Sequence, residues 1–157
     1  MPPSRWRTCA AACGGSDVGA RRKARELALQ MLFENDVTGT SPADMFQRST
    51  DLQNVSEGLR NFTKRLVAGT LEHRETLDAL ISRQADHWRL MRMPIVDRNI
   101  LRMALFELLH EPETPRPVVI DEALEIAKRF STPRSSQFIN GILDGVLKSG
   151  RAGLAET

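Results

Sequence analysis

The sequence predicts an all-α fold, a single compact domain of about seven helices, and three observations favour it. Apolar residues recur at helical spacing from residue 21 to residue 148, with prolines between several of the runs. Hydrophobic residues make up 41% of the chain, but aromatic residues make up only 5% and tyrosine is absent. An interior filled by aliphatic side chains suits helices better than sheets. Finally, the segment 95–110 is apolar over an arc too wide for one partner to bury, so several helices should surround it.

Each expected helix has an apolar stripe and a recognisable boundary. Ser41 supplies a capping hydroxyl immediately before Pro42, which suits the first turn of a helix. Pro94 limits the central helix in front, and Pro117 opens the helix that follows. The expected helices span residues 21–35, 41–52, 57–84, 95–110 and 117–130, and residues 85–94 form either a connector or a further helix start. The last helix starts near Thr132 and Pro133 or at Ser135 and ends before Gly150.

The central segment 95–110 has a polar side as well as an apolar one. A helical wheel gathers Ile100, Leu101 and Leu105 with their apolar neighbours into one arc that should form the core. Opposite this arc the wheel places four polar residues, namely Arg98, Asn99, Arg102 and His110.

The two ends of the chain differ from the helical part. Residues 1–20 are rich in Ala, Gly, Pro and Ser and show no periodicity, so we expect a disordered N-terminal extension. Residues 150–157 should form a flexible tail, which leaves residues 21–149 as the helical domain. Cys9 and Cys13 lack metal-ligand neighbours and are expected to be free thiols in a reducing compartment. No apolar run is long enough to span a bilayer, so we expect a soluble, cytoplasmic protein without a membrane partner.

No arrangement of side chains indicates catalysis. His73, His87 and His110 lack the spacing of a helical metal site. The chain has no glycine-rich phosphate loop, no Gly-x-Ser-x-Gly motif and no cysteine paired with a suitable base. We therefore expect a protein that is not an enzyme and that needs no metal or cofactor.

Positive charge is concentrated near the N-terminus. The formal charge is +5 over residues 1–25 and −3 over the remainder. The N-terminal dipole of a helix favours an anion, and arginine binds phosphate bidentately, so basic residues at a helix start suit a nucleic-acid backbone. The alternative is a solvated, solubilising end. The basic cluster at the start of the first helix consists of Arg21, Arg22, Lys23 and Arg25.

A second polar group lies on the last expected helix. Arg134, Gln137 and Asn140 fall on one side of that helix and carry donors and acceptors suited to the edges of bases. Gly141 and Gly145 leave a smooth strip beside them. The alternative is purely structural, since serines cap helix starts and glycines allow close helix packing.

Four segments are informative in their order along the chain. They are residues 22–33 (RKARELALQMLF), 66–69 (LVAG), 96–108 (VDRNILRMALFEL), and 119–128 (VIDEALEIAK) continuing through 138–144 (FINGILD). In this order they resemble the NusB family of transcription antitermination factors over residues 21–148. The resemblance implies an all-helical fold in two helical halves.

The resemblance also implies a function and a set of partners. NusB proteins bind boxA-type single-stranded RNA of ribosomal RNA operons with the ribosomal protein NusE, in an RNA polymerase complex that resists termination. Phe33 and Phe62 stand where the family often has tyrosine, so stacking is kept and a phenolic hydrogen bond is lost. Carried over by position, the expected RNA-binding residues are Arg21, Arg22, Lys23, Arg25, Phe33, Phe62, Arg134, Gln137 and Phe138, and the polar side of the last helix adds Asn140.

One alternative belongs to a different class of protein. Leu29 and Phe33 lie off the main apolar stripe of the first helix, so they could form the interface of a protein-only helical scaffold that touches no RNA. A homodimer in the absence of other partners is also compatible with the sequence. The discriminating observation is whether the basic cluster and the Arg134 side chain share one face.

Overall fold

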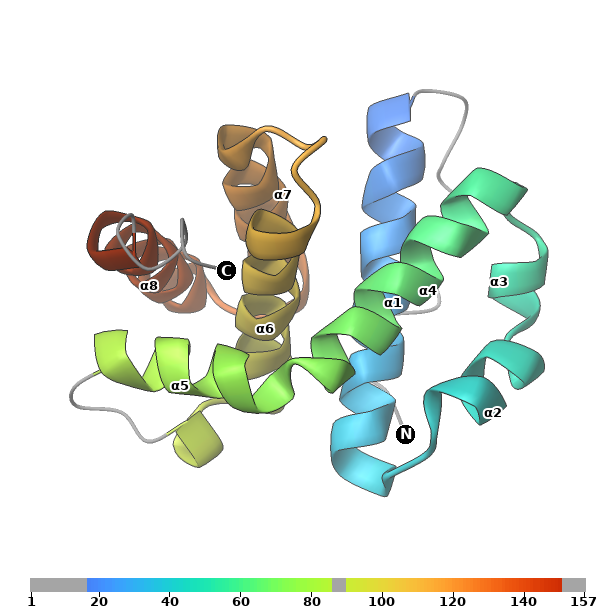
Figure 1. Ribbon diagram of the computed structural model, residues 1–157, viewed down its shortest axis with the longest axis horizontal. Coiled ribbons are helices and arrows are strands. Elements are labelled where there is room, and N and C mark those ends of the chain that lie inside the picture. The colour runs from blue at the N-terminus through green and yellow to red at the C-terminus, as the bar shows by residue number, and fades with distance from the viewer. Residues whose placement is uncertain (1–16, 86–89, 151–157) are drawn as a thin grey trace. The chain divides into compact units, whose positions relative to one another are not determined.

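Eight α-helices and one short 3₁₀ helix are formed by the residues that the structure, a computed structural model, describes, namely 17–85 and 90–150 (Figure 1). None of these residues belongs to a strand, so the predicted all-α class is confirmed. The chain divides into two compact units, Met1–Glu72 and His73–Thr157, which agrees with the two helical halves that the resemblance implies. Within the same described ranges, no helix is both long and apolar enough to cross a membrane.

The first unit is built on the packing of its two long helices. Its helices are α1 (Asp17–Thr38), α2 (Pro42–Arg48), α3 (Thr50–Gln53) and α4 (Glu57–Glu72). α1 and α4 lie side by side, and Leu32 and Leu66 are fully buried in the core of the unit. The two short helices add Met45 and Leu52 to the buried apolar residues. The stripe predicted for the first helix is therefore the side that packs.

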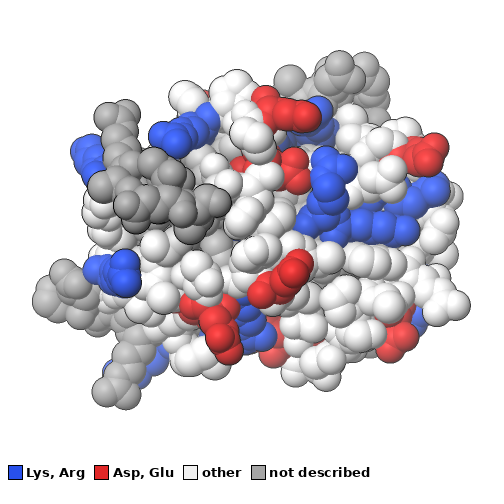
Figure 2. Space-filling model, in the orientation of Figure 1, with Lys and Arg blue, Asp and Glu red and all other residues white. Residues whose placement is uncertain are grey.

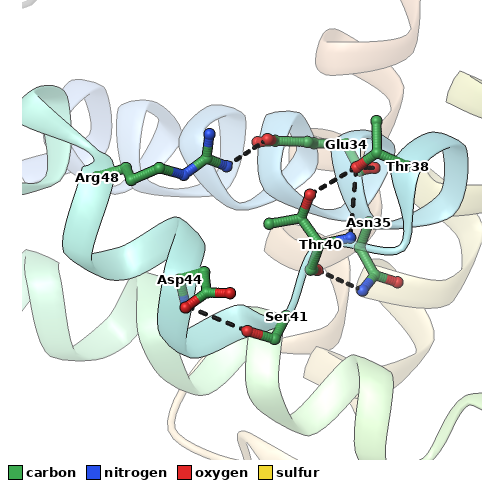
Figure 3. A network of polar contacts seen from close by, with 7 residues as sticks. All are labelled: Glu34, Asn35, Thr38, Thr40, Ser41, Asp44 and Arg48. Atoms are coloured by element: carbon green, nitrogen blue, oxygen red, sulfur yellow. Dashed lines mark hydrogen bonds and ion pairs between the residues drawn. The ribbon is translucent and has the colours of Figure 1, made fainter.

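The turn between α1 and α2 explains where α1 stops. Gly39 has a φ of 75°, a left-handed conformation that glycine adopts without steric cost. The side-chain nitrogen of Asn35 donates to the carbonyl oxygen of Thr40 at 2.8 Å (Figure 3). The Ser41 hydroxyl accepts a hydrogen bond from the backbone nitrogen of Asp44 at 3.3 Å, which confirms Ser41 as the cap of α2.

The second unit is arranged around its central helix. Its elements are α5 (Arg74–Gln84), η2 (Leu90–Arg92), α6 (Ile95–His110), α7 (Arg116–Phe130) and α8 (Pro133–Gly150). α6 packs against α5, α7 and α8, and it buries Ile100, Leu101 and Leu105 almost completely. The bounds of α6 are those that the sequence predicts.

The polar side of α6 is buried as well as its apolar arc, which the helical wheel does not show. Arg98, Asn99 and Arg102 lie opposite the apolar arc, yet all three are buried, with Arg102 only 2% exposed. Arg102 donates from Nε and Nη2 to the two carboxylate oxygens of Asp78 on α5, at 2.6 and 3.0 Å. The polar side of α6 can be buried because protein groups replace water as the hydrogen-bond partners of its side chains. His110, at the end of the helix, is exposed.

Two of the expected helices are each divided in the structure. The predicted helix 57–84 ends at Glu72 and restarts at Arg74, because His73 leaves helical geometry with φ −100° and ψ 15°. The predicted helix 41–52 breaks at Ser49, whose hydroxyl accepts from the backbone nitrogen of Leu52 and caps α3 instead. Serine favours such local capping over continuing a helix.

The ends of the helical part also differ from the prediction. Residues 17–20 were expected in the disordered extension, but they form the first turn of α1, which ends at Thr38 instead of residue 35. α8 spans Pro133–Gly150, so it starts at the earlier of the two predicted positions but includes Gly150. The expectations for residues 1–16 and 151–157, including both cysteines, lie outside the described residues, as do residues 86–89 with His87.

Candidate nucleic-acid interface

Three arginines surround one aromatic ring in the first unit. Phe62 of α4 is 5% exposed. The guanidinium carbons of Arg21 and Arg25 of α1 lie 5.5 and 5.4 Å from its ring centroid, and that of Arg65 lies 5.7 Å away. At these distances the electron-rich face of the ring attracts a cation. We call Phe62, Arg21, Arg25 and Arg65 the Phe62 cluster.

The helical geometry explains why these residues meet. Arg21 and Arg25 are four residues apart, so they share one face of α1. Phe62 and Arg65 are three residues apart on α4, which packs against α1. The sequence therefore brings four residues of two helices to one place through ordinary helical spacing and a single helix contact.

The predicted basic residues of α1 are not equally accessible. Arg21 is exposed, Arg22 and Lys23 are half-buried, and Arg25 is only 3% exposed. A phosphate therefore has access to Arg21, Arg22 and Lys23, whereas Arg25 supports the Phe62 ring from inside the structure. Phe33, further along the same helix, is half-buried.

Positive charge continues along α4. Lys64 lies with its ammonium nitrogen 5.7 Å from the ring centroid of Phe46, and Arg65 is exposed. Figure 2 shows lysine and arginine side chains gathered where α4 runs in Figure 1. Arg60 belongs to the fold instead, because its guanidinium donates to the carbonyl oxygens of Leu52, Gln53 and Val55, each at 3.2 Å.

The second group of predicted residues lies on α8 in the second unit. Arg134, Gln137 and Asn140 are exposed and Phe138 is half-buried. Arg134 and Phe138 line a pocket of about 320 Å³, whereas Gln137 and Asn140 lie outside its lining. The remaining lining residues are Met93, Pro94, Asp97, Thr132 and Ser135. We call this the Phe138 pocket.

A buried carboxylate holds the Phe138 pocket together. Asp97 is 2% exposed and accepts hydrogen bonds from the hydroxyls of Ser131 and Ser135, at 2.5 and 2.7 Å. The hydroxyl of Thr132 accepts from the backbone nitrogen of Ser135 at 3.1 Å and caps α8. Through these bonds the first turn of α6 fixes the junction of α7 and α8, and with it the position of Arg134.

The structure separates the predicted residues into two sets. Arg21, Arg25 and Phe62 meet in the first unit, and Arg134 and Phe138 meet in the second. Arg65 and Asp97 were not among the residues predicted from the sequence. Arg65 could have been found from its spacing of three residues from Phe62, but Asp97 carries no such signal, since an acidic residue in a first helical turn is ordinary.

Two further expectations concern the alternatives to an RNA interface. Leu29, proposed as part of a protein interface, is fully buried, so it offers no free apolar surface. Of the two glycines on α8, a Cβ at Gly145 would collide with the side chain of Gln84, whereas a Cβ at Gly141 would meet nothing within 4 Å. The Gln84 atoms are the end of a flexible side chain, so close packing favours glycine only weakly at position 145, and nothing in the structure explains Gly141.

The fold and these contacts define a class of protein. This is an all-helical, two-unit protein in which three arginines lie on the Phe62 ring of the first unit and Arg134 lines the Phe138 pocket of the second. Among the residues that the structure describes, no three His, Cys, Asp or Glu side chains are grouped to hold a metal ion.

Comparison with known proteins identifies the family. The family model described as NusB family matches residues 22–148. The transcription antitermination protein NusB of Koribacter versatilis (strain Ellin345) is 49% identical over 132 residues, covering 83% of this chain and 90% of that protein. The NusB of Symbiobacterium thermophilum is 46% identical over 147 residues, covering 87% and 96%. The chain belongs to the NusB family, whose members are transcription antitermination factors and are not known as enzymes.

Solved structures agree with this assignment. T. maritima NusB superposes with a TM-score of 0.76 at 34% identity, covering 87% of this chain and 97% of that chain. A second similar chain comes from a crystal structure of antitermination factors NusB and NusE in complex with dsRNA. It has a TM-score of 0.74 at 25% identity and covers 83% and 97%.

Proposed function

We propose that this protein is a non-catalytic RNA-binding adaptor that binds boxA-type single-stranded RNA together with the ribosomal protein NusE. In this role it promotes transcription antitermination of ribosomal RNA operons. The observation that carries the proposal is the Phe62 cluster, in which two arginines from the basic run of a NusB-family chain lie on an aromatic ring together with Arg65 of α4. Exposed guanidinium groups held in one place suit the closely spaced charges of an RNA backbone.

The two units divide the recognition of RNA in this proposal. Arg21, Arg22 and Lys23 neutralise phosphates, which gives affinity without sequence preference. In the second unit, Arg134 and Phe138 provide a guanidinium and a ring in the lining of a pocket, and an unstacked base can pack on such a ring. The exposed amides of Gln137 and Asn140 offer both donors and acceptors to base edges, and Phe33 offers a further ring.

The proposed partners follow the family. A related structure contains NusB and NusE in complex with dsRNA, which supports a joint surface for RNA and NusE. We extend this to the RNA polymerase complex in which nascent RNA emerges, and hence to action in the cytoplasm. The opposing proposal, a homodimeric scaffold that binds no RNA, loses its interface residue Leu29, which is fully buried.

A titration with fluorescent RNA tests the proposal. The protein with NusE should bind boxA RNA more tightly than a scrambled RNA of the same length. Replacing Arg21, Arg22 and Lys23 by glutamine should lower the slope of log affinity against log salt by up to about 2.1, because single-stranded RNA releases about 0.7 counterions per neutralised phosphate. Discrimination between the two RNAs should persist in this variant.

The complementary variant is Gln137→Ala, which keeps the charge. It should leave the salt slope unchanged and reduce the preference for boxA over scrambled RNA. Equal affinity of the unaltered protein for both RNAs, with and without NusE, would refute the proposal. Melting temperatures of all variants show whether a loss of binding comes from a loss of folding.

A further inference from the structure

Arg65 is the one arginine of the Phe62 cluster that lies on α4, outside the basic run of α1. We propose that Arg21 and Arg65 form a two-armed site for a phosphate of the RNA backbone, held by the Phe62 ring, with the buried Arg25 adding positive charge. This inference rests on the proposed function and deepens it by adding a residue of a second helix to the backbone contact. The ligand class is the phosphodiester of a single-stranded RNA.

The geometry of the cluster limits how far its charges can spread. All three guanidinium carbons lie between 5.4 and 5.7 Å from one ring centroid. No two of them can therefore be more than about 11 Å apart, which is twice the distance to the ring. The guanidinium groups therefore lie close enough together to act on the same stretch of a nucleic-acid backbone.

Electrostatics favours an anion at this place. The Debye length is about 8 Å at physiological ionic strength, so charges at these separations act together on a ligand. Lys64 on the same helix extends the positive surface. A bound phosphate would interact with several cations at once, and its neutralisation makes binding dependent on salt.

Accessibility selects which arginines make the contact. Arg21 and Arg65 are exposed, whereas Arg25 is 3% exposed and cannot reach a ligand without leaving the core. Arginine is suited to the task because its planar guanidinium stacks on an aromatic ring while its N–H groups bind phosphate bidentately. The two exposed arms come from different helices, so the site depends on the packing of α1 against α4.

Arg65→Gln is the test variant, and Arg48→Gln is its matched control. Arg48 belongs to the same unit, its side chain is 61% exposed, and its guanidinium pairs with Glu34 at 2.6 Å (Figure 3). Both variants lose one positive charge. With boxA RNA, Arg65→Gln should lower the salt slope by up to about 0.7, the value for losing one neutralised phosphate, so that its affinity deficit shrinks by up to about 2.6-fold between 50 and 200 mM salt. Arg48→Gln should keep the slope of the unaltered protein.

Two further variants test the two-armed geometry. Arg65→Lys keeps the charge, so the salt slope should stay while affinity falls, because an ammonium lacks the planar fork. Arg21→Gln with Arg65→Gln should lose less affinity than the product of the single losses, since both arms hold one phosphate. Independent losses in the double variant would overturn the shared site.

The outcomes separate this inference from the proposed function. Failure of the unaltered protein to prefer boxA RNA refutes the proposed function, and the inference with it. Normal RNA binding with equal slopes for Arg65→Gln and Arg48→Gln refutes only the role of Arg65. Loss of NusE binding by Arg65→Gln with an unchanged RNA slope would assign Arg65 to a protein contact and also overturn the inference.

Discussion

Arg102 shows at the scale of a single residue how a charged side chain can belong to the core. It is 2% exposed and its guanidinium is held by both carboxylate oxygens of Asp78. The Asp78 side chain is 24% exposed, so this pair is only partly withdrawn from water. Removing one partner of such a pair is costly because the other charge stays behind without its counterpart.

Arg102→Met should lower the free energy of unfolding by about 3 kcal/mol, the lower end of the range for broken buried pairs, because Asp78 retains some solvent. Adding Asp78→Leu should recover most of this loss, since both charges are then absent. Urea unfolding of the two single variants and the double variant measures the coupling. A double variant as unstable as the sum of the singles would show that the pair contributes no coupling energy.

The same residue shows why the sequence could not reveal this part of the core. A helical wheel shows only the direction in which each residue points from the helix axis, and Arg98, Asn99 and Arg102 point away from the apolar arc. Whether they are buried depends on hydrogen-bond partners elsewhere in the chain. Asp78 lies 24 residues before Arg102 on another helix, and no spacing rule connects them.

At the scale of an element, glycine has opposite effects in the α1–α2 turn and in α8. Gly39 ends α1 with a positive φ, where a Cβ is strained in any surroundings. Gly141 lies inside α8, is exposed, and has space for a Cβ, so it only weakens the helix.

Gly141→Ala should therefore raise the free energy of unfolding by about 0.5–1 kcal/mol, from helix propensity alone. Gly39→Ala should lower it by about 1–2 kcal/mol, because an L-residue is strained in the left-handed region. Thermal or urea melts of the two variants make the comparison. If Gly141→Ala lowered the free energy of unfolding, a Cβ at this position would have to collide with a neighbouring group, and the open space described here would be wrong.

Helix boundaries also show the limits of sequence at this scale. The bounds of α6 follow from Pro94 and the apolar arc, and they were predicted. The break of α2 from α3 at Ser49 rests on one side-chain hydrogen bond that competes with the helix. The break at His73 has no local cause in composition, because the residues on both sides keep helical spacing. The rings of His73 and His110 meet with their centroids 4.3 Å apart, a contact that depends on the tertiary fold.

At the scale of the whole molecule, the all-α class and the candidate residues of α1 and α8 followed from the sequence, while their accessibility did not. Periodicity placed Arg25 in the first helix, but only the packing of α1 shows that it is buried. The Phe138 pocket likewise depends on Asp97 reaching Ser131 and Ser135, across 34 and 38 residues of chain.

Binding of NusE and RNA to this protein should be thermodynamically coupled. Saturating NusE should raise the affinity for boxA RNA by a factor of about 5–150, the usual range for coupled sites, because both partners contribute contact surface. RNA must then raise the affinity for NusE by the same factor. Calorimetric titrations in both orders measure the two factors. Identical RNA affinity with and without NusE would show that the two sites are independent.

The contact between Phe62 and the three guanidinium groups also affects entropy. A free arginine side chain carries about 2 kcal/mol of rotamer entropy, which a flexible contact would lose when a ligand is bound. In this protein Arg21, Arg25 and Arg65 lie against the ring in the absence of any ligand. At the proposed site, a buried phenylalanine that itself touches no phosphate would therefore reduce the ordering cost of binding.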